Sequence, residues 1–194
     1  MTMITKNVEI LNSIRGQLLV AMPHIDDTRF KHAVIMMCQH DSEAAMGLML
    51  NKPKANLDLN ELRQKLKLKQ GFFDGDEPIY DGGPVENGRG FVLHSSDQML
   101  PDSLPVGADM GMSVQISIIN EIAAGTGPMK HRIMLGYAGW DKDQLEDELR
   151  AGMWFHMTAT TEFVFDIPAD QLWQRCFAAS GYNAASLSPH AGSA

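Results

Sequence analysis

The chain has few of the residue types that mark disulfide-rich, metal-binding or secreted proteins. Only two cysteines occur among its 194 residues, Cys38 and Cys176, and neither belongs to a Cys/His pattern with zinc-ligand spacing. Cys38 lies in the apolar run 33–38, which indicates a buried structural thiol. A secretory signal pattern and an apolar run long enough to cross a bilayer are both missing. We therefore expect a cytoplasmic protein with no membrane contact.

Positive charge is also scarce. The 16 Lys and Arg residues are outnumbered by 24 Asp and Glu residues, and the formal net charge is −8. A general nucleic-acid surface needs clustered cations that displace counterions. The one basic segment, 52–69, contains Asp58 and Glu61 and fits a solvated helix face better than a phosphate-binding stripe. The charge balance therefore argues against direct DNA binding.

Signatures of well-known catalytic sites are missing as well. The chain has no P-loop, G-x-S-x-G or H-E-x-x-H motif, and its Gly-Gly-Pro turn is not a dinucleotide fingerprint. His24, Asp26 and Asp27 place an imidazole beside two carboxylates, and His40 and Asp41 are further candidates. A metal site, however, needs ligands that converge from several segments, and no spacing here is diagnostic. We expect neither a metal nor a cofactor.

Hydrophobic patterning predicts a full set of secondary-structure elements. Strands are predicted over 16–22, 33–39, 46–50, 90–95, 131–136 and 162–165, and helices over 57–68, 141–151 and 168–179. Residues 113–124 are predicted as a short strand followed by a helix that ends at Gly125, and 78–96 as a hairpin. Because the strands cluster early and do not alternate regularly with helices, we expect an α+β fold with a largely antiparallel sheet.

Length and composition set the expected domain boundaries. The chain is long enough for one domain with its own core. We expect an N-terminal segment 1–15, a single domain 16–184 and a flexible, small and polar C-terminal tail 185–194. Within the domain, Pro53 is expected to end a strand, because proline cannot donate to a ladder. The two prolines in 100–109 predict a surface loop there.

The most informative stretch is 80–94, which combines a glycine-rich turn with one arginine and one histidine. Glycines such as Gly82 and Gly83 can adopt backbone angles that other residues avoid, or let another group approach closely. Arg89 can anchor a carboxylate or a phosphate, with a salt bridge as its structural alternative. His94 can act as a general base near neutral pH, with a purely structural role as its alternative.

Asn51, Tyr137 and Trp140 complete the set of candidate ligand-binding residues. Asn51 follows a predicted strand and either contacts a ligand or bonds the nearby backbone to fix a turn. Tyr137 and Trp140 lie where a predicted strand ends in small residues and leads into a helix. Trp140 is interpreted as either a core aromatic or the wall of a pocket.

The start of that helix is a second place where an anion could bind. Free backbone N–H groups at a helix start attract negative charge. Asp141 and Asp143 would already occupy this positive end and would repel a second anion. Capping of the helix is therefore favoured over phosphate binding.

Taken together, these stretches resemble the AlgH/YqgE family of bacterial proteins. The matching segments are 16–23 (GQLLVAMP), 47–53 (GLMLNKP), 82–85 (GGPV), 89–94 (RGFVLH), 135–140 (LGYAGW) and 144–146 (QLE). They occur in a fixed order and span nearly the whole chain. The resemblance implies a compact α/β domain with a bent, barrel-like sheet and flanking helices. The family is often described as transcriptional regulators, its molecular activity is not established, and it supplies no catalytic residues to carry over.

Two positions depart from the family pattern. The family usually has glycine where this chain has Ala44 and where it has Asp143. The first departure puts the usual turn before Met46 in doubt. The second weakens an anion-binding role for the segment 140–144.

These observations leave competing functional interpretations open. The favoured one is a non-enzymatic regulatory or interaction domain that acts through a protein partner or a small ligand. The alternative is a small-anion-binding protein or an enzyme that uses Arg89 and His94, together with Asn51, in a glycine-lined cleft. That alternative requires Arg89 and His94 to face the same side of the fold. Direct DNA binding ranks last, and the oligomeric state is left open.

Overall fold

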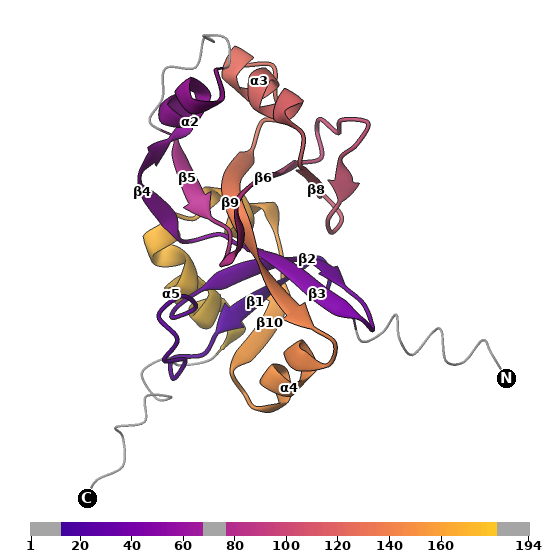
Figure 1. Cartoon of the computed structure of the whole chain (residues 1–194). Coiled ribbons are helices and arrows are strands. Elements are labelled where there is room, and N and C mark those ends of the chain that lie inside the picture. The colour runs from indigo at the N-terminus through magenta and orange to yellow at the C-terminus, as the bar shows by residue number, and fades with distance from the viewer. Residues whose placement is uncertain (1–12, 68–76, 182–194) are drawn as a thin grey trace, which may run out of the picture.

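A ten-stranded, strongly curled sheet organises the molecule. The computed structural model describes residues 13–67 and 77–181 (Figure 1). The strands are β1 (Gln17–Ala21), β2 (Val34–His40), β3 (Ala44–Met49), β4 (Pro53–Asp58), β5 (Pro78–Asp81), β6 (Val85–Ser95), β7 (Leu104–Pro105), β8 (Met110–Ser113), β9 (His131–Asp141) and β10 (Trp154–Thr158). The helices are α2 (Leu59–Leu66), α3 (Ile116–Ala124), α4 (Gln144–Arg150), the π-helix η1 (Glu162–Asp166) and α5 (Ala169–Ser180).

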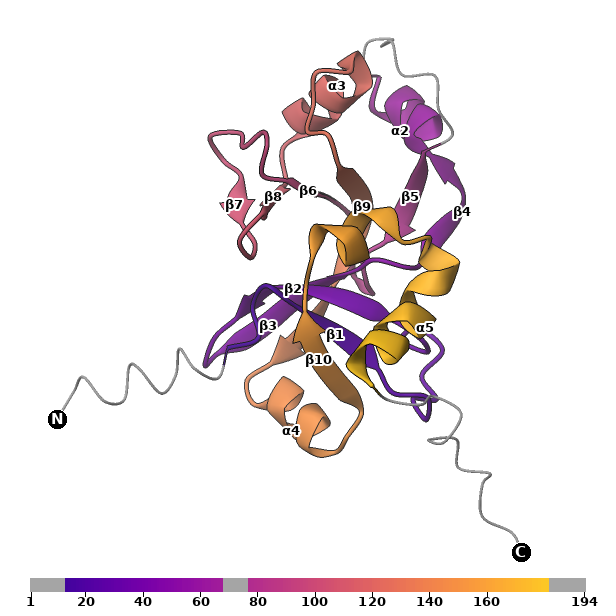
Figure 2. The same cartoon turned by 180° about the vertical axis from the view of Figure 1, so that it is seen from behind.

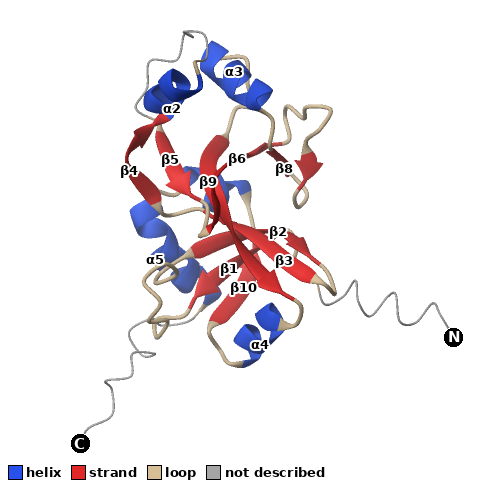
Figure 3. Ribbon diagram, in the orientation of Figure 1, coloured by secondary structure: helices blue, strands red, loops and turns tan. Residues whose placement is uncertain are grey.

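The strand order defines two halves of this sheet that share β9: the first half contains β10, β1, β2 and β3, and the second contains β4, β5, β6, β7 and β8. The main path runs β10-β1-β2-β3-β9-β6-β8-β7, and β5 pairs with β9 while β4 pairs with β5. All pairs are antiparallel except β5 with β9, which is parallel. The sheet curls into a half-barrel with few helices around it (Figure 3). The expected α+β single domain with a mostly antiparallel, bent sheet is confirmed.

Strand β9 joins the two halves and bends at Gly136. Residues 138–141 pair with β3, whereas the first part of β9 pairs with β5 and β6. Gly136 lies between these parts with a φ of 77°. Met134 and Tyr137 both pack on the same core although they are three residues apart, so the alternation of faces inverts at Gly136. One strand can thus serve both halves of the sheet.

The glycine-rich turn crosses this strand at the bend. Strands β5 and β6 both pair with residues 133–135 of β9, so they lie on its opposite edges. The segment between them must therefore pass over the β9 backbone. Gly82 fits there by donating its N–H to Leu135 O at 2.9 Å. Gly83 has a φ of 149°, and a Cβ on it would lie 2.1 Å from the carbonyl carbon of Tyr137. Backbone crowding, rather than a ligand, requires glycine at both positions.

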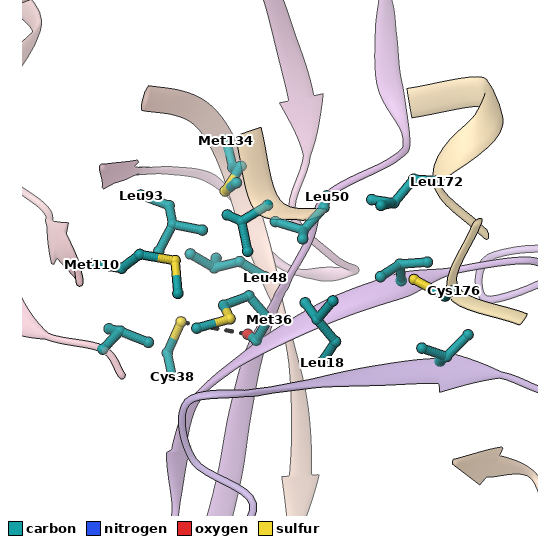
Figure 4. Packing of buried hydrophobic residues seen from close by; sticks show 14 of the residues in the cluster. Leu18, Met36, Cys38, Leu48, Leu50, Leu93, Met110, Met134, Leu172 and Cys176 are labelled. Atoms are coloured by element: carbon teal, nitrogen blue, oxygen red, sulfur yellow. Dashed lines mark hydrogen bonds between the residues drawn. The ribbon is translucent and has the colours of Figure 1, made fainter. Parts of the chain in front are cut away.

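Three hydrophobic cores pack against the curled sheet. The central core fills the half-barrel and contacts η1 and α5; it includes Leu18, Met36, Cys38, Leu48, Leu93, Met110, Met134, Leu172 and Cys176 (Figure 4). A second core under α4 contains Leu19, Ile35, Trp140, Leu145 and Trp154. A third core lies between α2, α3 and the second half of the sheet and contains Leu59, Leu62, Val92, Ile122 and Ile133. The helices at opposite ends of the sheet are seen in Figure 2.

A buried arginine fastens the C-terminal part of the chain to the sheet. The Arg132 guanidinium donates to the carbonyls of Val164 (2.6 Å), Leu50 (2.9 Å) and Ile167 (3.0 Å). Its carbon Cζ lies 4.8 Å from the centre of the Tyr80 ring. Burial lowers the pKa of Arg132 from its usual value. Three carbonyl acceptors and an aromatic face compensate for the lost hydration of this cation.

Several predicted elements are wrong in instructive ways. Residues 78–96 do not form a hairpin, because β9 lies between β5 and β6. Residues 162–165 form a π-helix rather than a strand, since a short apolar run does not distinguish the two. Pro53 begins β4 rather than only ending a strand, and the first position of a strand tolerates a missing N–H. Strand β9 continues through Asp141 instead of stopping at 136, so the segment 137–140 is strand and not a loop.

Other predictions are confirmed. Strands β1 and β2 and helix α5 lie where the pattern placed them, and α3 ends at a left-handed Gly125. The loop 100–109 carries only the two-residue β7, although Val106 within it is fully buried. The tail 185–194 and most of the segment 1–15 lie outside the described residues. In the described part of the chain, no helix has the length and apolar character needed to cross a membrane.

Candidate functional site

An open groove of about 680 Å³ lies where the half-barrel fails to close. Its walls come from β3, β6 and β9 on one side and from β7, β8 and the residue after β8 on the other. The segment before β1 contacts the second side through Arg15, whose guanidinium donates to Pro105 O at 2.5 Å. The curl of the sheet, rather than any single loop, therefore forms the groove.

The floor of the groove is apolar and partly aromatic. It is lined by Met46 and Phe91, by Met112, and by Tyr137. The Phe91 and Tyr137 rings meet edge to face with their centres 5.9 Å apart. Such pairs bury large areas in a fixed geometry. Methionine side chains beside them can adapt to different apolar groups.

Exposed aliphatic side chains extend this apolar surface beyond the groove. Leu104 and Val114 line the groove and are 55% and 47% exposed. Ile116 follows at the start of α3 and is 48% exposed. Contiguous exposed apolar side chains mark surfaces that bind another molecule.

Charged and amide groups form the rim. Arg89 is half-exposed, donates to Glu86 Oε2 at 3.0 Å and lies with Cζ 5.3 Å from the centre of the Phe91 ring. Gln39 and Asp141 also line the groove. The ion pair between Arg89 and Glu86 is exposed and therefore weak, so Arg89 can exchange its partner for an incoming carboxylate.

Trp140 lies in β9 and lines the groove, but its side chain is held by α4. Its Nε1–H donates to Glu148 Oε2 at 2.9 Å, and the Nε1–H of Trp154 donates to the same oxygen at 2.7 Å. The side chain is 5% exposed and belongs to the core under α4. Trp140 is thus a core aromatic whose position also contributes to the groove wall.

The Asn51 side chain hydrogen bonds to backbone groups. Its Oδ1 accepts from Val34 N at 2.9 Å and its Nδ2 donates to His32 O at 2.8 Å. Both ends of the amide therefore hold the loop before β2 against the end of β3, and Asn51 does not line the groove. Of its two interpretations, the structure supports the turn-fixing role.

His94 also lies away from the groove. Its side chain is fully buried and hydrogen bonds with Ser103 and Ser113. Arg89 lies over Phe91, whereas His94 shares the other face of β6 with Val92. The structure does not bring Arg89, His94 and Asn51 into one cleft, so the alternative built on their convergence has no geometric support.

Of the seven candidate residues, the groove unites Arg89, Tyr137 and Trp140. The two glycines form the strand crossing instead. The residues missed from the sequence are Phe91, Leu104, Met112 and Val114. A usable signal was present for Leu104, because an aliphatic residue between two prolines in a predicted surface loop has no obvious core to join.

The two departures from the family pattern are also explained locally. Asp143 has a φ of 61°, a left-handed conformation that glycine adopts more readily, and it makes no side-chain cap for α4. The turn before Ala44 forms without glycine, because Asp41 Oδ1 accepts from Glu43 N (2.9 Å) and Ala44 N (3.1 Å).

Neither cysteine is a reactive thiol, and no described group of side chains forms a metal site. Burial raises the pKa of the Cys38 thiol to about 12, and burial does the same for Cys176. Such thiols are inert at neutral pH. Among the residues that the structure describes, no group of three or more His, Cys, Asp or Glu side chains could hold a metal ion.

The fold and the groove together define an α+β half-barrel domain with an open, partly apolar groove. The chain belongs to the AlgH-like family, whose model matches residues 18–185. It is 39% identical to a UPF0301 protein of Rhizobium rhizogenes, over 97% of each chain. A UPF0301 protein of Methylobacterium nodulans is 41% identical over 92% of this chain and 89% of the relative.

Solved structures share the architecture. The solution structure of the AlgH protein from Pseudomonas aeruginosa matches with a TM-score of 0.74 and 38% identity, over 92% of this chain and 95% of that one. A crystal structure of a Corynebacterium diphtheriae protein matches with a TM-score of 0.69 at 20% identity, over 84% and 85% of the two chains. The second match shows the common fold alone.

Proposed function

We propose that this protein is a regulatory interaction domain that binds an apolar segment of a partner protein in the groove. The observation that carries the proposal is the continuity between the aromatic floor and the exposed side chains of Leu104 and Val114. A small ligand would contact only the floor of the groove, whereas a partner protein would also cover the exposed apolar side chains at its rim. Arginine and aromatic residues are also the types that dominate the energy of protein interfaces.

The rim adds a preference for charge. Arg89 is the cation among the groove-lining residues, and its exposed ion pair with Glu86 costs little to exchange. A carboxylate on the partner, placed beside the apolar segment, would form a charge-assisted bond with the guanidinium. The proposed partner segment is therefore aliphatic or aromatic with an adjacent acidic residue.

Any effect on transcription would then be exerted through a protein. The formal net charge of −8 disfavours the counterion release on which general DNA binding depends. The same proposal places the protein in the cytoplasm, where its two free, buried cysteines stay reduced.

The test is quantitative capture of partners with matched surface variants. Leu104→Asp and Val114→Asp put a charge at the exposed rim and should leave the melting temperature unchanged. Proteins captured from a bacterial lysate by the wild type should be captured at least about ten-fold less, a loss of about 1.4 kcal/mol. Arg89→Glu should weaken capture of the same proteins by reversing the rim charge.

Met129→Asp is the matched control. Met129 is 81% exposed and does not line the groove, so the same chemical change there should leave capture unchanged. Equal capture by the wild type and all three groove variants would contradict the proposal. Loss of capture with Met129→Asp as well would show that added charge, and not the groove, governs binding.

A further inference from the structure

A buried histidine and two serine hydroxyls meet on the face of β6 that the groove does not use. His94 Nε2 lies 3.2 Å from Ser113 Oγ and 3.3 Å from Ser103 Oγ. The two hydroxyl oxygens are 2.6 Å apart. His94 lies in β6, Ser113 ends β8, and Ser103 immediately precedes β7, so the cluster joins three segments. Strands β6, β7 and β8 lie near one another in Figure 2. A serine within hydrogen-bond reach of an oriented histidine is the geometry of an activated nucleophile.

The surrounding contacts fix which nitrogen acts as the base. His94 Nδ1 lies 3.0 Å from Ser95 O, and a carbonyl only accepts, so Nδ1 carries the proton. In the neutral ring, Nε2 is then the acceptor that faces both hydroxyls. Ser103 Oγ already accepts from Leu100 N at 3.0 Å, which directs its own proton towards Ser113 or His94. The cluster is therefore arranged to take a proton from Ser103.

The imidazole is also held in place by the backbone opposite it. A Cβ on Gly111 would lie 2.8 Å from His94 Cε1 and 2.6 Å from Met99 Sδ. No larger residue fits at Gly111 without displacing the ring, so the pocket is shaped around the imidazole. A base that is locked in one rotamer loses nothing to reorientation during proton transfer.

Access differs between the members of the cluster in the way a nucleophilic site requires. His94 and Ser113 are 0% exposed, whereas Ser103 is partly exposed at the surface. Met99 and the neighbouring Leu104 are 39% and 55% exposed, which provides an apolar rim beside the hydroxyl. The base is therefore fully buried, whereas the residue that carries the candidate nucleophile reaches the surface beside apolar side chains.

The residue before Ser103 has a buried polar atom without a hydrogen-bond partner among the described residues. This atom is Asp102 Oδ2. An unsatisfied buried carboxylate oxygen costs stability and is uncommon in native folds. Such costs accumulate at sites that serve binding or chemistry.

We propose that Ser103 is a nucleophile, activated by His94 with Ser113 as a bridging hydroxyl, which accepts an acyl group from esters or thioesters with apolar acyl chains. The cluster lies on the opposite face of β6 from the groove, with Leu104 bordering both, and the proposal does not depend on the interaction role. Ser103 Oγ forms a bond to the carbonyl carbon as its proton passes to His94 Nε2. The alkoxide or thiolate leaves with that proton, and an acyl ester remains on Ser103.

Water completes the cycle. His94 Nε2 takes a proton from a water molecule, whose oxygen attacks the acyl carbon of the Ser103 ester. The bond between Oγ and that carbon breaks, and His94 returns the proton to Ser103. The products are a free carboxylic acid and the regenerated hydroxyl, with no oxidant or reductant required.

The test uses an alkyl fluorophosphonate, which phosphonylates activated serines irreversibly, followed by mass spectrometry of the intact and digested protein. The expected result is one adduct per chain on Ser103. Ser103→Ala should abolish the adduct, and His94→Gln should slow its formation by about 100-fold or more, the usual contribution of a general base. Ser96→Ala, at an exposed serine outside the cluster, should label like the wild type.

A second readout covers the case in which His94→Gln fails to fold. A p-nitrophenyl ester of a short fatty acid should release p-nitrophenol with the wild type and not with Ser103→Ala, whose side chain is only partly buried. Absence of any adduct on the folded wild type, under conditions that label a known serine hydrolase, would overturn the proposal. So would an adduct that persists in Ser103→Ala or forms on another residue.

Discussion

The two halves of the sheet bury their side chains to different degrees. In the first half, β2 is covered on both faces, and Val34, Ile35, Met36 and Met37 are all 0% exposed. The second half ends in β8 and β7, beside which Leu104 and Val114 are about half exposed. Burial on both faces stabilises the first half, whereas the second leaves apolar surface open. The comparison separates the part of the sheet that is buried on both faces from the part that leaves apolar side chains exposed.

The largest loss of stability is expected from a substitution at Gly83, where the turn between β5 and β6 crosses β9. In Gly83→Val the new Cβ would lie 2.1 Å from the carbonyl carbon of Tyr137, and φ at this position is 149°. Both the clash and the strain require the backbone of β9 or of the turn to move. We expect a loss of more than about 4 kcal/mol in the free energy of unfolding, measured by urea denaturation, or failure to fold.

Gly88→Val is the matched control for this substitution. Gly88 lies in β6, outside the crossing, and a Cβ there has no neighbour within 4 Å. The same added side chain should change the free energy of unfolding by no more than about 0.5 kcal/mol. Similar losses for both variants would show that valine itself, and not the crossing, is responsible.

The next largest change in the free energy of unfolding is expected when a buried leucine of the first half, rather than an exposed leucine of the second half, is truncated to alanine. Leu18 is 0% exposed in the central core, and Leu18→Ala should destabilise the fold by about 2–5 kcal/mol. Leu104 is 55% exposed, and Leu104→Ala should stay within about 0.5 kcal/mol of the wild type. Thermal or urea unfolding of both variants measures the contrast. A large loss for Leu104→Ala would mean that the second half is not the open surface described above.

A smaller, pH-dependent contribution to the free energy of unfolding is expected from His131 in the second half. His131 Nε2 lies 2.9 Å from Glu77 Oε1. Burial lowers the pKa of His131. The hydrogen bond and the charge of Glu77, together with the bond to Pro128 O, have the opposite and larger effect, so the pKa of His131 is raised above 6.5. Protonated His131 therefore stabilises the fold. This contribution is fully present below pH 6.5 and is lost as pH rises through the higher folded-state value.

The measurement compares the wild type with His131→Gln. Urea unfolding between about pH 5.5 and about pH 8.5 should show the stability advantage of the wild type falling as pH rises. Titrations common to both proteins cancel in the difference. An advantage that is constant across this range, or that grows with pH, would contradict the assignment.

Sequence patterns predicted the elements whose signal is local. The continuous apolar runs of β1 and β2 and the four-residue spacing in α5 are all set by neighbours in the chain. The crossing at Gly82 was not predictable, because nothing in the turn itself reveals that β9, some fifty residues later, lies between β5 and β6. The inversion at Gly136 was hidden for the same reason.

The candidate site was only partly predictable for a related reason. Arg89 and Tyr137 line the groove, but Asn51 bonds the backbone and His94 faces the opposite side of β6. Residue type indicates which side chains can bind a ligand, whereas the face on which each lies depends on register and curl. The exposed Leu104 was missed because a single aliphatic residue in a loop carries no periodicity, and its place between two prolines was the signal that could have found it.

The buried Arg132 constrains how the protein can be made. Two of its three acceptor carbonyls belong to Val164 and Ile167, which are synthesised 32 and 35 residues after Arg132. Strand β10, the outer neighbour of β1, is also synthesised after Arg132. Until then the guanidinium has to remain hydrated, so we expect the nascent half-barrel to stay open. Chains that stop before Val164 should therefore expose this cation to water and be recognised by proteases.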